Sequence, residues 1–127
     1  MNDESLSFVE EGQPIYNIRH RAFYFSKEIV LFIRDIQYDK MYFSMFEQLL
    51  RSATSIGANL VEGYAGSSKN DFIKFYNIAL KSANETKYWL CLIRETILNN
   101  ETKIDQLIIE ANEISKVIAT IIINAKK

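Results

Sequence analysis

The sequence predicts an all-α fold, an antiparallel up-down-up-down four-helix bundle. Three observations favour it. Apolar residues recur at alternating steps of three and four, which places them on one side of a helix. The polar breaks between these segments are short, so that successive helices become antiparallel neighbours. Four glycines and one proline in 127 residues are too few for a β fold with many turns.

The chain divides into a tail and one domain. Residues 1–14 are predicted to be a flexible N-terminal tail, because they are rich in acidic residues, lack helical periodicity and end with Gly12 and Pro14. Residues 15–127 are predicted to form a single four-helix-bundle domain, since this length suits one hydrophobic core.

The first two predicted helices cover about residues 15–38 and 42–65, separated by the polar run at 38–40. The stripe of the first helix is Ile18, Ala22, Phe25, Ile29, Phe32 and Ile36. The stripe of the second is Tyr42, Phe46, Leu49, Ala53, Ile56 and Leu60. The second helix is expected to end between Gly63 and Gly66, because glycine is the usual residue after a helix.

Two capping patterns predict where the next helices begin. Ser68 with Asp71, and Thr102 with Asp105, each place an acidic residue three positions after a hydroxyl residue, as in a capping box. The predicted helices cover about residues 69–98 and 103–125, with a turn at 99–102. The stripe of the third is Phe72, Tyr76, Ala79, Ala83, Leu90, Ile93 and Ile97. The stripe of the fourth is Ile104, Leu107, Ala111, Ile114, Ile118, Ile121 and Ala125.

The second helix carries an unusual glycine and a wide apolar surface. Gly57 inside a helix costs about 1 kcal/mol relative to alanine, so we expect its missing side chain to permit the close approach of another backbone. Gly57 and Gly63 are therefore close-packing candidates. The apolar surface spans roughly 140°, wider than the about 100° that one core needs, because it extends through Phe43, Leu50, Gly57 and Val61.

A polar stripe follows one flank of the same helix and consists of Gln48, Arg51, Ser55, Asn59 and Glu62. One interpretation is a solvated face or a hydrogen-bond network that fixes how helices dock. The other is a ligand or nucleic-acid site. A phosphate-binding loop is excluded, because neither GxxxxGK[ST] nor GxGxxG occurs there.

These residues carry a resemblance. The segment QLLRSATSIGANLVEGYAGSSKNDFIKFYNIALKSANETKYWL (48–90) resembles the signature of the four-helix-bundle family of 23S rRNA intervening-sequence proteins. The departures are Gly57, where many members have proline, and Ser52, where many have a second basic residue. The matching positions are Gln48, Arg51, Ser55, Ile56, Asn59, Glu62, Gly63, Phe75, Ala79, Ser82 and Glu85.

The resemblance implies a bundle assembled as a ring-like homopentamer, and it adds Ser82 and Glu85 to the polar stripe. Some genes of the family lie inside insertions in ribosomal RNA genes. Basic relatives act as accessory proteins to the reverse transcriptases of diversity-generating retroelements. For most members no activity is known.

Catalytic and metal chemistry finds little support. A di-iron bundle needs two Glu-x-x-His motifs and two further carboxylates, but His20 is the only histidine. Cys91 is interpreted as a packing residue. Because it is the only cysteine in the sequence, no intrachain disulfide can form. Glu62 and Glu85 would suit a glycosidase-like carboxylate pair only in a cleft, and we expect them instead to accept hydrogen bonds from Arg51, Asn59 or Ser82. No catalytic residue, metal or cofactor is predicted.

The favoured function is therefore a non-enzymatic, homo-oligomeric assembly or adaptor protein. The alternative is an RNA- or DNA-binding accessory protein that acts with a ribosomal RNA or reverse transcriptase partner. The net charge of −1 gives no global attraction to polyanions, so the alternative depends on the local lysines Lys69, Lys74 and Lys81. Aromatic residues beyond the needs of one core favour a protein interface; they are Tyr24, Tyr42, Phe43, Tyr64, Tyr88 and Trp89.

No contact with a membrane is expected, and the predicted location is cytoplasmic. The most apolar run, residues 117–125, is too short to span a bilayer. The acidic N-terminus lacks the basic and then apolar layout of a signal peptide.

Overall fold

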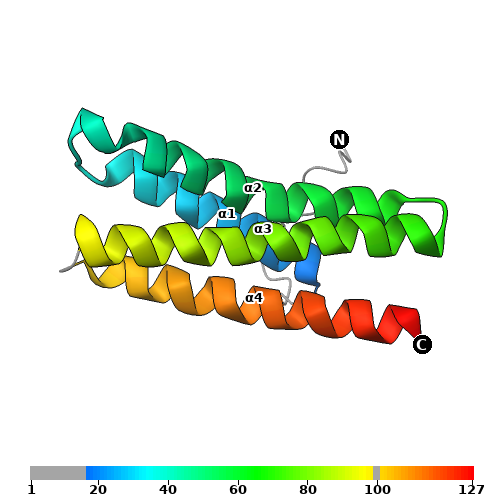
Figure 1. Ribbon diagram of the computed structural model, residues 1–127. Coiled ribbons are helices and arrows are strands. Elements are labelled where there is room, and N and C mark those ends of the chain that lie inside the picture. Colours follow the sequence, from blue (N-terminus) through cyan, green and yellow to red (C-terminus); the bar gives the residue numbers. More distant parts are fainter. Residues whose placement is uncertain (1–16, 99–100) are drawn as a thin grey trace, which may run out of the picture.

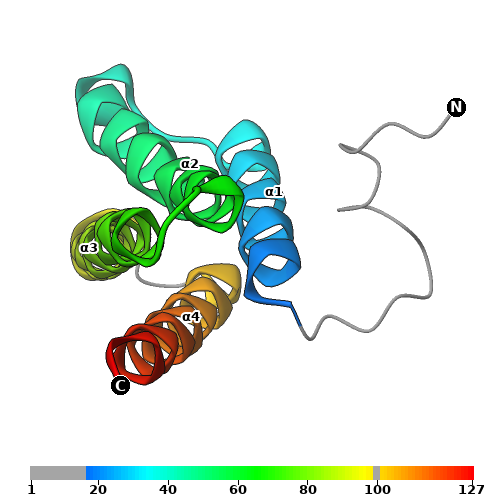
Figure 2. The ribbon, with the colours of Figure 1, turned by 90° about the vertical axis from the view of Figure 1, so that its right-hand side faces the viewer.

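Four α-helices pack side by side around one core in the computed structural model, which describes residues 17–98 and 101–127 (Figure 1). They are α1 (Ile18–Asp35), α2 (Phe43–Ala65), α3 (Lys69–Thr96) and α4 (Thr102–Lys126). A short 3₁₀ turn, η2 (Lys40–Tyr42), precedes α2. Seen end-on, the helices follow one another around a square, and each packs on its two neighbours (Figure 2). The predicted antiparallel four-helix bundle is confirmed. The predicted tail, residues 1–14, lies outside the described residues.

The core consists of the apolar stripes that the spacing predicts. Most of their residues are buried, and those that are only partly buried lie at helix ends or beside them. In α4, Ile122 is buried while Ile121 is partly exposed. The reason is periodic: Ile122 follows the buried Ile104 by 18 residues, which is five full turns of a 3.6-residue helix, so both lie on the same face.

The α1–α2 connection begins earlier than the sequence predicts. Helix α1 ends at Asp35, three residues before the predicted end, and the chain becomes extended at Ile36. Tyr38 leaves the helix and stacks on Phe46, with 3.8 Å between ring centroids. The side chain of Asp39 then accepts a hydrogen bond from the Met41 backbone N–H at 3.0 Å, which caps η2.

One of the two predicted capping patterns is confirmed. The Ser68 hydroxyl accepts a hydrogen bond from the Asp71 backbone N–H at 3.1 Å and begins α3. The prediction for α4 is wrong, because Thr102 is already helical and Glu101 is the capping residue. Residues 99–100 of the predicted turn lie outside the described residues.

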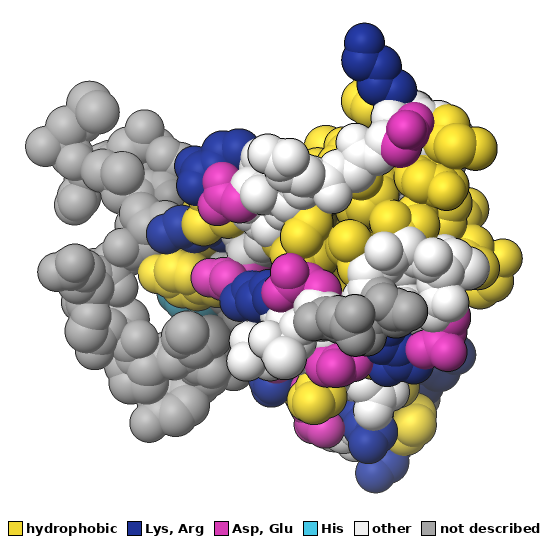
Figure 3. Space-filling view, turned by 90° about the vertical axis from the view of Figure 1, so that its left-hand side faces the viewer, with side chains coloured by type: hydrophobic (Ala, Val, Ile, Leu, Met, Phe, Trp, Pro, Cys, Tyr) yellow, Lys and Arg dark blue, Asp and Glu magenta, His cyan; other side chains and the backbone are white. Residues whose placement is uncertain are grey.

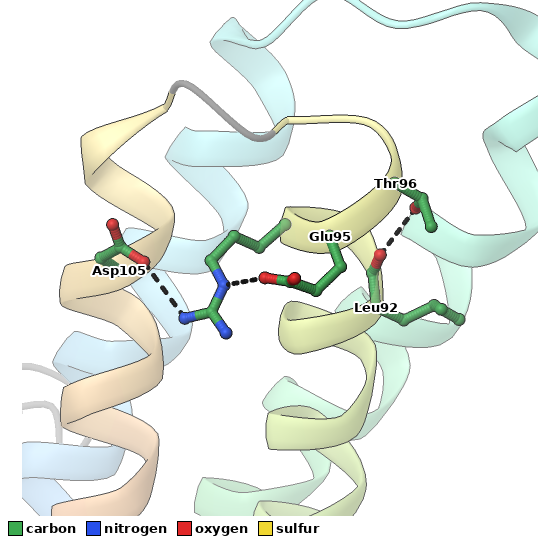
Figure 4. Close-up of polar contacts among 5 residues, drawn as sticks. Leu92, Glu95, Thr96 and Asp105 are labelled. Atoms are coloured by element: carbon green, nitrogen blue, oxygen red, sulfur yellow. Dashed lines mark hydrogen bonds and ion pairs between the residues drawn. The ribbon is translucent and has the colours of Figure 1, made fainter.

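The carboxylate of Asp105 forms an ion pair with Arg94 on α3. It lies 3.2 Å from the Arg94 guanidinium, which also binds its neighbour Glu95 at 2.8 Å (Figure 4). Both hydrogen bonds raise the pKa of Arg94. The carboxylate therefore ties the start of α4 to the end of α3, since Arg94 reaches it across the helix pair.

Candidate functional site

The polar stripe of α2 meets α3 in a set of hydrogen-bonded side chains, here called the hydroxyl network: Ser52, Ser55, Ser82 and Thr86. The hydroxyl oxygens of Ser55 and Ser82 lie 2.9 Å apart. Thr86 donates to the Ser82 carbonyl oxygen at 2.7 Å, and its Oγ1 lies 3.0 Å from Ser52 Oγ. Asn59 Nδ2 adds donors at 2.9 Å to the hydroxyl and the carbonyl oxygen of Ser55.

The side chains of the hydroxyl network serve as hydrogen-bond partners for one another. Thr86 is fully buried and Ser52 nearly so. Within the described residues, no buried side-chain nitrogen or oxygen atom lacks a hydrogen-bond partner. A satisfied buried network restricts how two helices can dock, because a shift would leave polar groups unpaired. The contacts that join α2 to α3 are therefore those of Ser55 with Ser82 and of Ser52 with Thr86, whereas Asn59 supports Ser55 from within α2.

The remaining residues of the predicted polar stripe do not join this network. Gln48 is partly buried, and Arg51 and Glu62 are exposed on α2. Glu85 accepts a hydrogen bond from the Trp89 indole N–H at 3.0 Å. The prediction that Glu62 and Glu85 accept hydrogen bonds from Arg51, Asn59 or Ser82 is therefore wrong. For Glu85 the reason is that Trp89, one turn further along the same helix, supplies a nearer donor.

Sequence reasoning missed Ser52 and Thr86. One signal was available for Thr86: the predicted apolar stripe of α3 has a gap between Ala83 and Leu90, and Thr86 fills it. A threonine at a core position needs a partner for its hydroxyl. A small polar residue at the facing position of α2 supplies that partner.

Thr86→Val tests the contribution of the hydroxyl network. Valine keeps the shape but removes the hydroxyl, so that Ser52 loses a buried partner. We expect the free energy of unfolding to fall by about 1 kcal/mol. Thr96→Val is the matched control, because Thr96 makes the same type of bond to the carbonyl oxygen four residues earlier but is exposed. Denaturant unfolding of both variants measures the difference, and equal losses would contradict a special role for Thr86.

The two close-packing candidates face different helices. A β-carbon at Gly57 would lie 3.6 Å from the β-carbon of Ala22 on α1, an ordinary contact distance. A β-carbon at Gly63 would lie 2.8 Å from the Tyr76 ring and 3.1 Å from the Phe75 β-carbon on α3. The backbone that approaches Gly57 is therefore α1 of the same chain, whereas Gly63 admits the aromatic side chains of α3.

An apolar groove follows the outer side of the α1–α2 pair. Its hollow part has a volume of about 400 Å³ and is lined by Arg19, Phe23, Ser26, Thr54, Gly57, Ala58, Val61 and Glu62. Exposed hydrophobic side chains extend it along both helices. The side chain of Val61 is 40% exposed, that of Val30 45% and that of Phe43 58%. We use the name apolar groove for this whole surface, including Leu50.

Further hydrophobic surface lies beside the start of α2. Figure 3 looks onto the end of the bundle that carries the α1–α2 connection. Hydrophobic side chains gather there over α2 and the preceding segment, while charged side chains gather on the other side of this face. Met41 in η2 and Phe43 at the first position of α2 are both largely exposed.

A second groove, between α1 and α4, differs in charge. Its hollow of about 340 Å³ is bordered by two ion pairs. Arg21 binds Glu110 through two hydrogen bonds of 2.7 and 2.8 Å, which raise the pKa of the guanidinium, and Lys103 lies 2.7 Å from Glu28. These four charges neutralise one another across the helix pair, so the α1–α4 groove has no net attraction for an ion.

The lysines proposed for nucleic-acid contact all lie on α3 and are exposed. Lys74 and Lys81 are seven residues apart and share a face with Tyr88, seven residues further on. The Lys74 ammonium lies 5.3 Å from the centroid of the Phe75 ring. Lys69 stands at the first position of the helix. Lys74 and Lys81 therefore lie on one line along α3, whereas Lys69, five residues before Lys74, lies on another side of the helix.

Two further features concern the described part of the chain. In residues 17–98 and 101–127, no group of three or more His, Cys, Asp or Glu side chains is arranged to hold a metal ion. No helix in that part of the chain has both the length and the apolar character to cross a membrane.

The chain is a small all-α bundle whose second and third helices are joined by the hydroxyl network. The chain belongs to the family of 23S rRNA-intervening sequence proteins, whose sequence model matches residues 16–120. The predicted family is thus confirmed. Residues 1–15 precede the matched span.

A solved structure agrees with this membership. The chain is similar to a protein with unknown function from the S23 ribosomal protein family of Bacteroides thetaiotaomicron, whose crystal structure superposes with a TM-score of 0.77. The two are 37% identical, and the match covers 84% of this chain and 98% of the other. No curated protein matches the chain significantly.

Proposed function

We propose that this protein is a non-enzymatic assembly or adaptor protein that associates with further copies of itself through the apolar groove. The observation that carries the proposal is the row of exposed hydrophobic side chains along α1 and α2. Contiguous apolar surface of this kind marks interaction sites on soluble proteins. The row comprises Phe23 and Val30 on α1, and Phe43, Leu50 and Val61 on α2.

The spacing of these side chains suits a helix as the occupant. On α2, Phe43, Leu50 and Gly57 recur every seven residues, and on α1 Phe23 and Val30 do the same. A seven-residue repeat keeps an apolar surface facing a packed helix. Because Gly57 has no side chain, nothing projects from this position into the groove. Such a helix can therefore approach closely. A second copy of this all-helical chain supplies suitable helices, and the subunit number we propose, five, comes from the family resemblance.

Gly57→Leu tests this proposal. Leucine fills the groove, while its β-carbon meets Ala22 only at ordinary contact distance. The bundle should therefore remain folded, and the oligomer should dissociate towards the monomer. Gly57→Ala is the matched control: it should keep the wild-type mass and unfold at a higher temperature, since alanine is favoured over glycine in a helix by about 1 kcal/mol. Light scattering gives the masses, and wild-type mass for the leucine variant would contradict the proposal.

A second candidate function is nucleic-acid binding by α3. The observation that favours it is the alignment of Lys74, Lys81 and Tyr88 on one exposed face, because lysines that contact the backbone and aromatic side chains that stack on bases occur together in single-strand binding proteins. It ranks second because the net charge of the chain is −1.

Fluorescence anisotropy with a labelled random RNA oligonucleotide tests this second function. Binding should appear at low salt and weaken steeply as salt is raised, because counterions are released from the phosphates. Lys74→Glu with Lys81→Glu should abolish it, whereas Lys116→Glu with Lys126→Glu on α4 should have a smaller effect. Failure of the wild type to bind at low salt would exclude this function.

A further inference from the structure

Four exposed charges on α2 and α3 take no part in the hydroxyl network. They are Arg51 and Glu62 on α2, and Lys74 and Glu85 on α3. Within residues 17–98 and 101–127, none of the four belongs to an ion pair. The carboxylate of Glu85 binds the indole N–H of Trp89 instead. All four charges therefore face the surroundings of the bundle without an opposite charge from the described part of their own chain.

The charges have the same spacing on both helices. Glu62 follows Arg51 by eleven residues on α2, and Glu85 follows Lys74 by eleven residues on α3. Eleven residues make three helical turns to within about 20° and rise by about 16.5 Å, so the two charges of each helix lie on one face. Each helix carries the cation first. Because α2 and α3 run in opposite directions (Figure 1), the order of the signs along the bundle is reversed between them.

Arg51 and Glu85 lie at nearly the same height along the bundle. Each directly precedes a member of the hydroxyl network, Ser52 on α2 and Thr86 on α3. The hydroxyl oxygens of those two residues are 3.0 Å apart. Consecutive residues of a helix differ in height by only about 1.5 Å, so this contact also fixes the heights of the cation and the anion beside it.

Glu62 and Lys74 lie at a second matching height. They directly precede Gly63 and Phe75, and a β-carbon at Gly63 would lie 3.1 Å from the β-carbon of Phe75. Two places along the bundle therefore carry an anion and a cation at the same height on neighbouring helices, although the two charges do not pair within one chain.

A ring of copies whose axis follows the helices preserves these heights. The copies of a closed ring are rotated about its axis and are not shifted along it. The α3 helix of one copy then runs antiparallel to α2 of the next copy, at the height that it has beside its own α2. An α3 helix that enters the apolar groove of the next copy thus brings Glu85 to Arg51 and Lys74 to Glu62.

The same register also matches hydrophobic side chains. Ile78 and Tyr88 are 36% and 59% exposed on α3, and they share the outer face of this helix with Lys74 and Glu85. In the antiparallel arrangement, Tyr88 lies within one turn of Leu50, and Ile78 lies within one turn of Val61. Leu50 and Val61 belong to the apolar groove. The face of α3 is therefore complementary to the groove in both charge and hydrophobicity.

We propose that α3 of a second copy is the helix that fills the apolar groove, with Glu85 paired to Arg51 and Lys74 paired to Glu62. The inference rests on the proposed function for the assembly itself and adds the surface that the partner presents and its direction. The contact joins two different surfaces, so it is heterologous and repeats from copy to copy until a ring closes. It assigns to a protein partner the face of α3 that the second candidate function gives to nucleic acid.

Charge reversal tests the first pair. Arg51→Glu or Glu85→Arg alone places like charges opposite each other, and each should raise the dissociation constant for self-association at least about tenfold. An equimolar mixture of the two variants should associate again, because each chain finds the opposite charge on the other. Lys116→Glu, at an exposed position of α4, is the matched control and should leave the constant unchanged. Sedimentation velocity measures all four samples.

The mixture separates contacts between chains from contacts within one chain. If Arg51 and Glu85 acted only within their own chain, the double variant would recover association while the mixture would not. That result would overturn the proposal. Glu62→Lys and Lys74→Glu provide the same test at the other end of the groove, and they should behave in the same way, singly and mixed.

The outcomes distinguish this inference from the proposed function. A wild-type chain that stays monomeric would refute the assembly and the inference together. Association that persists unchanged in Arg51→Glu and Glu85→Arg would overturn the inference alone and leave the groove to another occupant. If Lys74→Glu abolished binding of a labelled RNA oligonucleotide but left self-association unchanged, the face of α3 would serve nucleic acid, and the inference would be overturned.

Discussion

Gly63→Ala is expected to destabilise the bundle by about 1–3 kcal/mol, the usual cost of overpacking a core. The added β-carbon would lie 2.8 Å from a Tyr76 ring atom and 3.1 Å from the Phe75 β-carbon. The Tyr76 ring has little room to withdraw, because it is buried and stacked on Phe72 at 4.0 Å between ring centroids. The strain should therefore exceed the gain of about 1 kcal/mol that alanine brings to a helix.

Gly57→Ala provides the comparison for this prediction, because both glycines lie in α2 but only Gly63 has a neighbour closer than 3.6 Å. Thermal and denaturant unfolding of the two variants should therefore move in opposite directions. If Gly63→Ala were as stable as the wild type, the packing of α2 on α3 at this point would be looser than the structure describes.

The second large effect is expected from placing charge in the apolar groove. Leu50→Glu with Val61→Glu should leave the bundle folded, since both side chains are more than one third exposed, at 37% and 40%. In an assembled state the two carboxylates would be buried without partners, and an unpaired buried charge is strongly unfavourable. We expect the dissociation constant for self-association to rise about 100-fold or more, since each 1.4 kcal/mol changes it tenfold.

The control for this variant is Ile109→Glu with Ile123→Glu on α4, where the side chains are 64% and 60% exposed. It introduces the same charges on another face of the molecule. Circular dichroism verifies that both variants keep their helices, and analytical ultracentrifugation measures association. Equal weakening by the two variants would show that net charge, rather than the groove, governs assembly.

The fold was predictable because its signals are local and repeated. The stripe from Ile18 to Phe32 in α1, like the stripes of the other helices, follows from the three-and-four spacing alone. The start of α3 at Ser68 was equally readable. The start of α4 was misassigned because the carboxylate of Asp105 serves an ion pair with Arg94, a tertiary contact that a local pattern cannot reveal.

The candidate site was predictable only in part. The spacing placed Ser55 and Asn59 on one flank of α2, but the position of Ser82 came from the resemblance. Only the structure shows that their partners are one another. The width of the apolar surface around Leu50 and Val61 indicated the wall of the apolar groove that α2 contributes. Its other wall, with Phe23 and Val30, required knowledge of which helix packs beside α2.

Assembly of this chain with copies of itself through the apolar groove is tested most directly by the mass of the unmodified protein in solution. Sedimentation equilibrium measures this mass from low to high micromolar concentration. We expect a reversible, concentration-dependent rise from the monomer mass of 14.8 kDa to a discrete multiple of it, which we propose to be five. A mass that stays at the monomer value throughout this range would contradict this assembly.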